Sequence, residues 1–315
     1  MLFALLIRHV GVAQILANLR QAGWVLLPIC LLWIPVYGCR AIAWQLCMGK
    51  APGRPPYWRT VVISSITYAV NLVTPFVQAG GEVLRVGAMT PWLGKQRAAG
   101  STVTYYMLHA LSNMIMWLLS LVLLLVLVPL STPLVTAFAV TGVVIVALIA
   151  FVFSRHQQGV VAPVERLLSR IPLVRRLVKP LERRRDRLEE LDRVITGFYR
   201  ESPARFFLAL SIDVAGRTLA TAEYWFTAWA LGIHLSGATT LIVAGLGGLI
   251  VNVIFFVPLE TGVKEGGLYG AFHLVGLDPA LGVFAAIVQR LREFVWIAIG
   301  LACIPLAGGR TKVTE

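Results

Sequence analysis

Long apolar runs separated by short polar connections make up most of the chain. They cover residues 24–48, 61–79, 101–130, 135–153, 206–235, 239–259 and 281–306. Several exceed the roughly 18–20 apolar residues that a helix needs to cross a bilayer. The strict alternation of an outer-membrane barrel strand is missing from these runs. The pattern predicts one all-α polytopic membrane domain over residues 1–315, with about six to eight membrane helices.

The composition agrees with a membrane protein and sets the meaning of the charge. The chain is 58% hydrophobic and 14% charged, against about 45–50% and about 25% in soluble domains. These values exclude a soluble enzyme, a disordered chain and a disulfide scaffold. Lys and Arg number 28 against 15 acids. Since no nucleic-acid-binding motif accompanies this excess, we assign it to basic loops that face anionic lipid and not to nucleic acid.

The polar connections sort by charge and predict the orientation of the chain. Basic residues gather at 50–59, 95–97 and 155–205 and at the C-terminus, whereas 130–133 and 233–238 hold no Lys or Arg. The positive-inside rule therefore places the basic loops and the C-terminus on the cytoplasmic side of a bacterial inner membrane. Residues 181–198 have the pattern of an amphipathic helix lying on lipid headgroups. Residues 1–20 form either a short first span or a surface segment.

Two segments are too short to cross and return as full helices. Residues 82–94 cannot span a hydrocarbon core about 30 Å thick at 1.5 Å per residue. We therefore expect 60–94 to be re-entrant from the cytoplasmic side, with its turn at 75–82. The same reasoning makes 237–278 re-entrant from the opposite side, with its turn at 258–265. Such backbone is tolerated at membrane depth only where protein buries it or it lines a wet cavity.

The two turns repeat one pattern 183 residues apart. Pro75 matches Pro258, Glu82 matches Glu265, and Gly-Ala at 87–88 matches Gly-Ala at 270–271. Together with the topology, this predicts an inverted repeat with cores at 24–130 and 206–306, joined by the basic connection at 155–205. Paired Gly/Pro-interrupted segments mark the binding site in secondary transporters. The predicted turn residues are Asn71, Pro75, Gly80, Gly81, Pro258 and Gly262.

Ionisable residues at membrane depth, in the apolar runs or in the re-entrant segments, are costly and mark a functional site by default. Carboxylates there would pair with arginines, bind a cationic headgroup or carry a proton, and arginines would hold a phosphate through two parallel hydrogen bonds. The alternatives are a buried ion pair that joins the halves and arginines that extend to the membrane surface. The candidate substrate-binding and translocation residues are Glu82, Glu265, Arg40, Arg85, Arg217, Lys264, Arg290 and Arg292.

No enzymatic motif accompanies these charges. The sequence contains no HExxH, GxSxG, Walker A or GxGxxG pattern, and its four cysteines form no cluster with histidine. We therefore predict no catalytic residue, no metal ion and no cofactor.

Three segments resemble a known family: NLVTPFVQAGGEVLR at 71–85, PLETGVKE at 258–265 and QRLR at 289–292. They are similar to the lysylphosphatidylglycerol synthetase transmembrane-region (flippase-like) integral membrane proteins. In bifunctional members a soluble aminoacyl-transferase domain makes the lipid that this region flips. The given sequence shows no such domain, so we expect a stand-alone member without synthase activity. It departs from the family in having Leu259, Glu260 and Thr261 where glycines are usual.

The resemblance implies a flippase or transporter that moves a lipid between the leaflets of the inner membrane. The implied substrates are anionic or aminoacylated phospholipids, hopanoids or lipid-linked intermediates, and an enzyme partner would supply the lipid. Two alternatives stay open. One is a membrane-embedded lipid-modifying transferase. The other is a non-transporting scaffold for a lipid- or glycan-modifying enzyme, in which Glu82 and Glu265 would be dispensable.

Overall fold

The structure is a computed structural model that describes residues 17–18, 20–49, 53–74, 80–155, 202–254, 260 and 262–307. Helices and turns account for this part of the chain, and no strand occurs in it. The prediction of an all-α fold is therefore confirmed. The helices are η1 (Gly23–Val25), α3 (Leu26–Cys47), α4 (Tyr57–Val73), α5 (Gly80–Leu93), α6 (Lys95–Leu127), α7 (Thr132–Arg155), α11 (Pro203–Ala230), α12 (Gly237–Val253), α13 (Val263–Leu274), α14 (Pro279–Ala302) and α15 (Ile304–Ala307).

Three of the described helical segments are long and apolar enough to cross a membrane: Arg20–Cys47, Lys95–Leu127 and Thr132–Ser154. Helices α11 and α14 are comparable in length, with 28 and 24 residues, but they carry buried charges. Helices α4, α5, α12 and α13 are shorter, with 17, 14, 17 and 12 residues. The predicted total of six to eight membrane helices stays a prediction.

Several predicted features lie outside the described residues. They are most of the first 20 residues, nearly all of the connection at 155–205 with its amphipathic segment, and the basic C-terminus with Arg310 and Lys312. Pro75 and Pro258, the two prolines of the repeated pattern, also fall outside.

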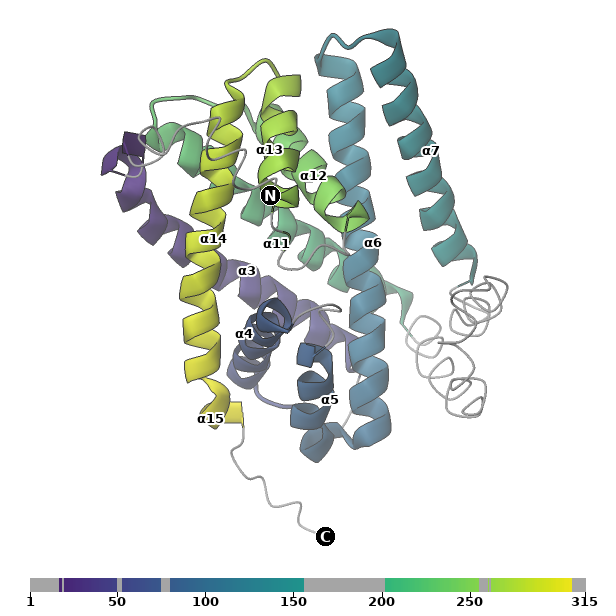
Figure 1. The fold of residues 1–315 in the computed structure, drawn as a ribbon. Helices are drawn as coiled ribbons and strands as arrows, with labels where there is room; N and C mark the ends of the chain where they lie inside the picture. Colours follow the sequence, from purple (N-terminus) through teal and green to yellow (C-terminus); the bar gives the residue numbers. More distant parts are fainter. Residues whose placement is uncertain are drawn as a thin grey trace.

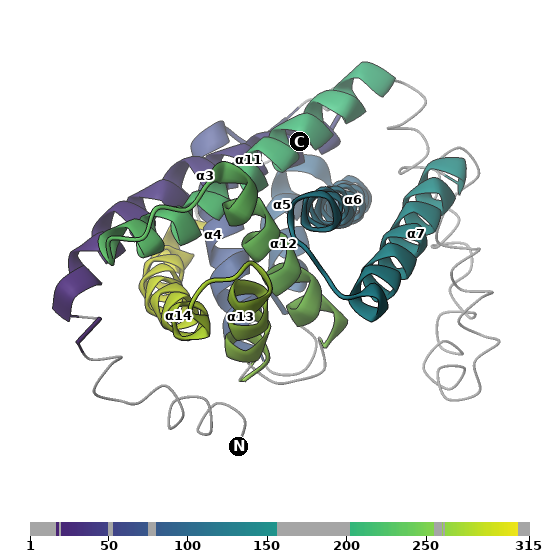
Figure 2. The ribbon, with the colours of Figure 1, turned by 90° about the horizontal axis from the view of Figure 1, so that it is seen from above.

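Helices α3 and α11 pack along each other and cross the bundle diagonally (Figures 1 and 2). Helices α6 and α14 run through most of its height in Figure 1. Helices α4 and α5 pack together as a hairpin in the lower half of that view, and α12 and α13 form a second hairpin in the upper half. Helix α7 stands at one edge, where it packs against α6 (Figure 2). The two hairpins therefore occupy opposite halves of the bundle.

Contacts between the two parts of the chain come in reciprocal pairs. Helix α4 packs on α14 while α12 packs on α6, and α3 touches α14 while α11 touches α6. Two halves related by a two-fold axis make contacts of this kind. Helix ends follow the same spacing: Cys47 and Ala230 close α3 and α11, and Gly80 and Val263 open α5 and α13, 183 residues apart in both cases.

The first hairpin is closed by a very short distance between its helices. A Cβ atom on Gly81 would lie 2.3 Å from the backbone oxygen of Thr67, so only glycine fits there. The Gly81 N–H also donates to Asn71 Oδ1 at 2.8 Å. Asn71 therefore lies in the last turn of α4, and Gly80 and Gly81 open α5, so the three residues flank the connection between the two helices. Neither glycine has a positive φ, so the backbone conformation does not require glycine at these positions. The missing side chains instead allow the two helices to pack closely.

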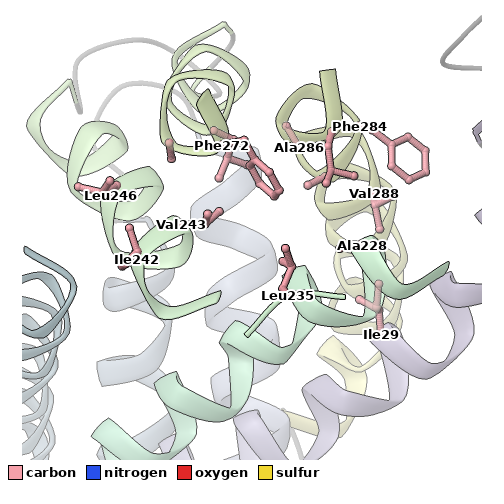
Figure 3. Close-up of a cluster of buried hydrophobic side chains, with 14 of the residues drawn as sticks. Ile29, Ala228, Leu235, Ile242, Val243, Leu246, Phe272, Phe284, Ala286 and Val288 are labelled. Carbon is pink, nitrogen blue, oxygen red and sulfur yellow. The ribbon is translucent and has the colours of Figure 1, made fainter. Parts of the chain in front are cut away.

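Apolar side chains from both parts of the chain fill the core, as Figure 3 shows. Ile29 of α3, Val243 of α12, and Phe272 and Phe284 from α13 and α14 are almost completely buried in one cluster. Helix α12 lies so close to α6 that the Ser120 hydroxyl donates to the backbone oxygen of Leu241 at 2.7 Å. Small residues and such hydrogen bonds hold helices together where lipid removes the hydrophobic driving force.

Candidate functional site

A dense ionic network joins α13 to α14. Lys264 Nζ lies 2.7 Å from Glu293 Oε1 and 3.1 Å from Glu260 Oε2. One turn away, Arg290 Nε donates to Glu265 Oε1 at 2.5 Å. Lys264 and Glu265, adjacent in sequence, therefore each reach a partner on α14. Buried charges require such partners, because removal from water is otherwise very costly.

Glu265 has a second role at the start of α13. Its Oε2 accepts the backbone N–H of Gly262 at 2.8 Å, three residues earlier. Gly262 is the N-cap residue and has a φ of 84°, a left-handed conformation that glycine adopts without steric cost. Glu265 is fully buried. It therefore fixes the first turn of α13 and holds Arg290 at the same time.

Glu260 combines an unusual backbone with two contacts. Its φ is 53°, a conformation that side-chain-bearing residues rarely adopt. Its backbone oxygen accepts from Arg290 Nη2 at 3.3 Å, and its carboxylate faces Lys264. The sequence departure at this position thus adds a carboxylate to the network, in a conformation that a glycine would reach more easily.

Arg292 joins four helices at the centre of the molecule. Its Nε and Nη2 donate to the two carboxylate oxygens of Glu223 on α11, at 3.2 and 3.3 Å, and its Nη1 donates to the Tyr68 hydroxyl on α4 at 2.9 Å. Its Cζ lies 3.9 Å from the ring centre of Trp33 on α3, whose Nε1 also donates to Glu223 at 3.2 Å. Arg292 is only 3% exposed. An extension of this side chain to the membrane surface is therefore wrong.

Aromatic rings continue from this pair toward Arg40. The Tyr37 ring lies 5.6 Å from that of Tyr68 and 4.6 Å from that of Trp296. Arg40 Cζ lies 5.2 Å from the Trp33 ring and 5.6 Å from the Tyr37 ring. Within the described ranges, Arg40 makes cation–π contacts and no ion pair. This aromatic cluster therefore contacts two arginines, Arg40 and Arg292, and the second of them is paired with Glu223.

A second ion pair connects α6 to α11. Asp213 is fully buried, and its Oδ2 lies 3.0 Å from His109 Nδ1 and 3.3 Å from Arg217 Nε. Arg217 also donates to the side-chain oxygen of Asn113, and to the backbone oxygen of His109 at 3.0 Å. Asp213 and Arg217 are one helical turn apart on α11, a spacing that places both side chains on one face of the helix.

Glu82 and Arg85 lie on α5, beside α4 and α6. Glu82 Oε1 accepts from Asn71 Nδ2 at 3.2 Å and from the Tyr106 hydroxyl at 2.8 Å. Arg85 Nη1 is 3.7 Å from Glu82 Oε2, so their contact is ionic without a hydrogen bond. The Arg85 guanidinium contacts the rings of Trp44 and Tyr105, 4.5 and 5.0 Å from their centres, and the two rings lie next to each other, 6.4 Å apart. Arg85 is 6% exposed, so extension to the surface is wrong here too.

The predicted site residues therefore fall into three groups. Lys264, Glu265 and Arg290 lie between α13 and α14, and Glu82 and Arg85 lie on α5. Arg292, Arg40 and Arg217 lie around the crossing of α3 and α11. The predicted excess of arginine over acids shrinks, because Arg217, Arg290 and Arg292 each have a bonded carboxylate.

Sequence reasoning missed the neutral partners of these charges. The missed residues are Trp33, Tyr68, Tyr106 and Asn113, together with Glu260 as a partner of Lys264. The spacing of Trp33 and Tyr37, one helical turn apart and one turn before Arg40, was the available signal. In the described ranges, no three His, Cys, Asp or Glu side chains lie close enough to hold a metal ion.

Comparison with known proteins agrees with the resemblance drawn from the motifs. A family model described as the lysylphosphatidylglycerol synthase TM region matches residues 1–300. No curated protein and no solved structure matches the chain.

Proposed function

Because the chain belongs to the lysylphosphatidylglycerol synthase transmembrane-region family, we propose that it is a lipid transporter that moves a phospholipid between the two leaflets of a membrane. Membership of this family and the long apolar helices make it a multi-pass membrane protein with a lipid-related role. Lipid movement between leaflets, the lipid itself and a bacterial inner membrane as its location belong to the proposal.

One observation carries the proposal. Two helical hairpins, α4–α5 and α12–α13, lie in opposite halves of the bundle, and each places a carboxylate in the first turn of its second helix. Glu82 and Glu265 are these carboxylates, and each lies beside an arginine. We take the hairpins as re-entrant segments of an inverted repeat, the architecture in which secondary transporters bind substrate near the midplane.

The ionic contacts suggest how the two states differ. The pairs of Arg290 with Glu265 and of Lys264 with Glu293 hold α13 against α14. A headgroup phosphate that binds a cation of this set competes with its carboxylate, and this competition loosens the contact. Rocking of one half against the other would then expose the headgroup on the opposite side. No bond in the lipid changes in this cycle, so the proposed protein is not an enzyme and needs no cofactor.

Leaflet exchange in liposomes tests the proposal. The purified chain is reconstituted with fluorescent lipids that carry anionic, zwitterionic or aminoacylated headgroups, and exchange is followed by a membrane-impermeant quencher. We expect exchange of at least one lipid, and a loss of about tenfold or more in Glu82→Gln and Glu265→Gln, because each substitution removes a charge from the proposed path.

The matched control is Asp278→Asn. Asp278 is exposed and caps α14 through the N–H of Ala280, and asparagine preserves that cap. Its exchange rate should equal that of the unmodified chain. Exchange that survives in both glutamine variants would refute the proposed path. Absence of exchange with every lipid would instead favour a membrane scaffold for a lipid-modifying enzyme, in which the two glutamates are dispensable.

A further inference from the structure

Arg85 has an unsatisfied guanidinium group in the interior of the protein. Its Nε and Nη1 atoms are buried and have no hydrogen-bond partner. The neighbouring Oε2 of Glu82, at 3.7 Å, is too distant for a hydrogen bond and is itself buried without a partner. Arg217 and Arg292, by contrast, each donate to a carboxylate. Since a buried donor without a hydrogen-bond partner is costly even beside an opposite charge, this geometry calls for an acceptor.

The surroundings of Arg85 fit an anion that carries several acceptor oxygens. The rings of Trp44 and Tyr105 pack against the guanidinium and restrict its orientation while its donor edge stays unused. Trp44 Nε1 is a further buried donor without a partner. Three donor atoms in neighbouring side chains are thus unsatisfied, and a phosphate group offers enough acceptor oxygens for all of them. Arginine prefers this ligand because it bonds phosphate through two parallel contacts.

The cations at the other hairpin, Lys264 on α13 and Arg290 on the adjacent α14, already have carboxylate partners. Lys264 lies near two carboxylates, and Arg290 donates to Glu265 at 2.5 Å. A phosphate at that hairpin would have to displace bonded carboxylates. At Arg85 it would displace only the longer contact with Glu82. The two hairpins therefore differ in their capacity for an anion in this conformation.

From these contacts we infer that Arg85, beside Trp44 and Tyr105, is a phosphate-binding subsite of the protein in this conformation and that Glu82 competes with the phosphate for it. The inference rests on the proposed transport of phospholipid, of which it names the binding group. The phosphate belongs either to a lipid headgroup or to a free anion, and the test separates these sources.

Binding to the purified full-length chain in detergent provides the test. The probes are dioctanoyl phosphatidylglycerol, dioctanoylglycerol, which lacks the phosphate, and inorganic phosphate, each titrated by ligand-dependent thermal stabilisation. We expect phosphatidylglycerol to bind, dioctanoylglycerol to bind at least tenfold more weakly, and Arg85→Gln to remove that difference. Arg85→Lys keeps the charge but loses the paired donors, so its affinity should fall between the two.

Glu82→Gln should bind phosphatidylglycerol more tightly than the unmodified chain, a result that misfolding of the variant cannot produce. Loss of the competing charge at 3.7 Å should tighten phosphatidylglycerol binding by about tenfold, because the coulombic attraction to Arg85 at that distance is appreciable even at an effective dielectric constant of about 20. The control is Arg97→Gln, an exposed arginine near the start of α6, which should bind like the unmodified chain.

The outcomes separate the two claims. Unchanged binding in Arg85→Gln, or no tightening in Glu82→Gln, would overturn the subsite. Inorganic phosphate that binds as well as phosphatidylglycerol, with the same dependence on Arg85, supports the subsite with a free anion as its ligand. Phosphatidylglycerol binding that depends on Arg85, without leaflet exchange in liposomes, keeps the subsite and refutes transport alone.

Discussion

The contact between Arg292 and Glu223 offers a strong test of the architecture. Both side chains are nearly inaccessible, with 3% and 2% exposure, and two hydrogen bonds join them across α11 and α14. Removal of one member of a buried pair costs about 3–5 kcal/mol, because the other charge is left without compensation. In Glu223→Gln, Arg292 keeps Tyr68 and the more distant Glu293, at 2.9 and 3.7 Å. We therefore expect Glu223→Gln to lower the free energy of unfolding by about 3 kcal/mol, at the lower end of this range.

This loss translates into a measurable temperature shift. At an unfolding entropy of about 2.1 cal/mol/K per residue, one kcal/mol moves the Tm of a 315-residue chain by about 1.5 °C, so Glu223→Gln should lower Tm by about 4–5 °C. The assay heats the detergent-solubilised protein in steps and follows the remaining monodisperse fraction by size-exclusion chromatography. Arg97→Gln, an exposed substitution near the start of α6, serves as the control and should stay within about 0.5 kcal/mol.

A double-mutant cycle separates this pair from a general loss of packing. Arg292→Gln alone should also destabilise, since it leaves the Glu223 carboxylate buried with Trp33 as its remaining donor. The double variant carries no uncompensated charge, so it should be no less stable than the worse single variant. Strictly additive losses in the cycle would refute a direct interaction, and a shift of less than about 2 °C in both single variants would show that the pair is not buried as described.

Two further predictions concern helix packing and the second ion pair, and the same thermal assay checks both. Gly81→Ala should destabilise by about 1–3 kcal/mol, because its Cβ would lie 2.3 Å from a backbone oxygen, whereas Gly87→Ala, with no atom within 4 Å, should be neutral or stabilise by up to about 1 kcal/mol. Equal effects would refute the close approach of α5 to α4. Asp213→Asn should destabilise by about 3–5 kcal/mol, because Arg217 is left without its carboxylate, and a restoring effect of Arg217→Gln in that background would identify the cause.

Local contacts were predictable from the sequence because they depend on spacing alone. Asp213 and Arg217 are four residues apart, so one helix face must carry both. The apolar runs at 101–130 and 135–153 located α6 and α7 to within about six residues at each end, since apolar residues make up most of both helices. Glycines at 245 and 247 indicated close packing, and a Cβ at either position would indeed meet a neighbouring helix, at Ser120 and Leu268.

The partners of the central charges were not predictable, because they come from distant parts of the chain. Arg292 bonds Glu223 and Tyr68, which are 69 and 224 residues away in sequence. No local pattern chooses such partners; the packing of α4, α11 and α14 does. Position in a run was also a poor guide to exposure. Arg85 lies outside every apolar run and Arg292 lies within the run at 281–306, yet neighbouring helices bury both.

At the centre of the molecule, positions that are related by the repeat offset carry different residue types in the two halves. Arg40 of α3 and Glu223 of α11 are 183 residues apart, and so are His109 of α6 and Arg292 of α14. Arg40 and Glu223 both contact Trp33, so corresponding positions lie near each other at the centre. Identical charges there would repel across a medium with little water to screen them, whereas opposite charges attract. This constraint favours divergence at the centre.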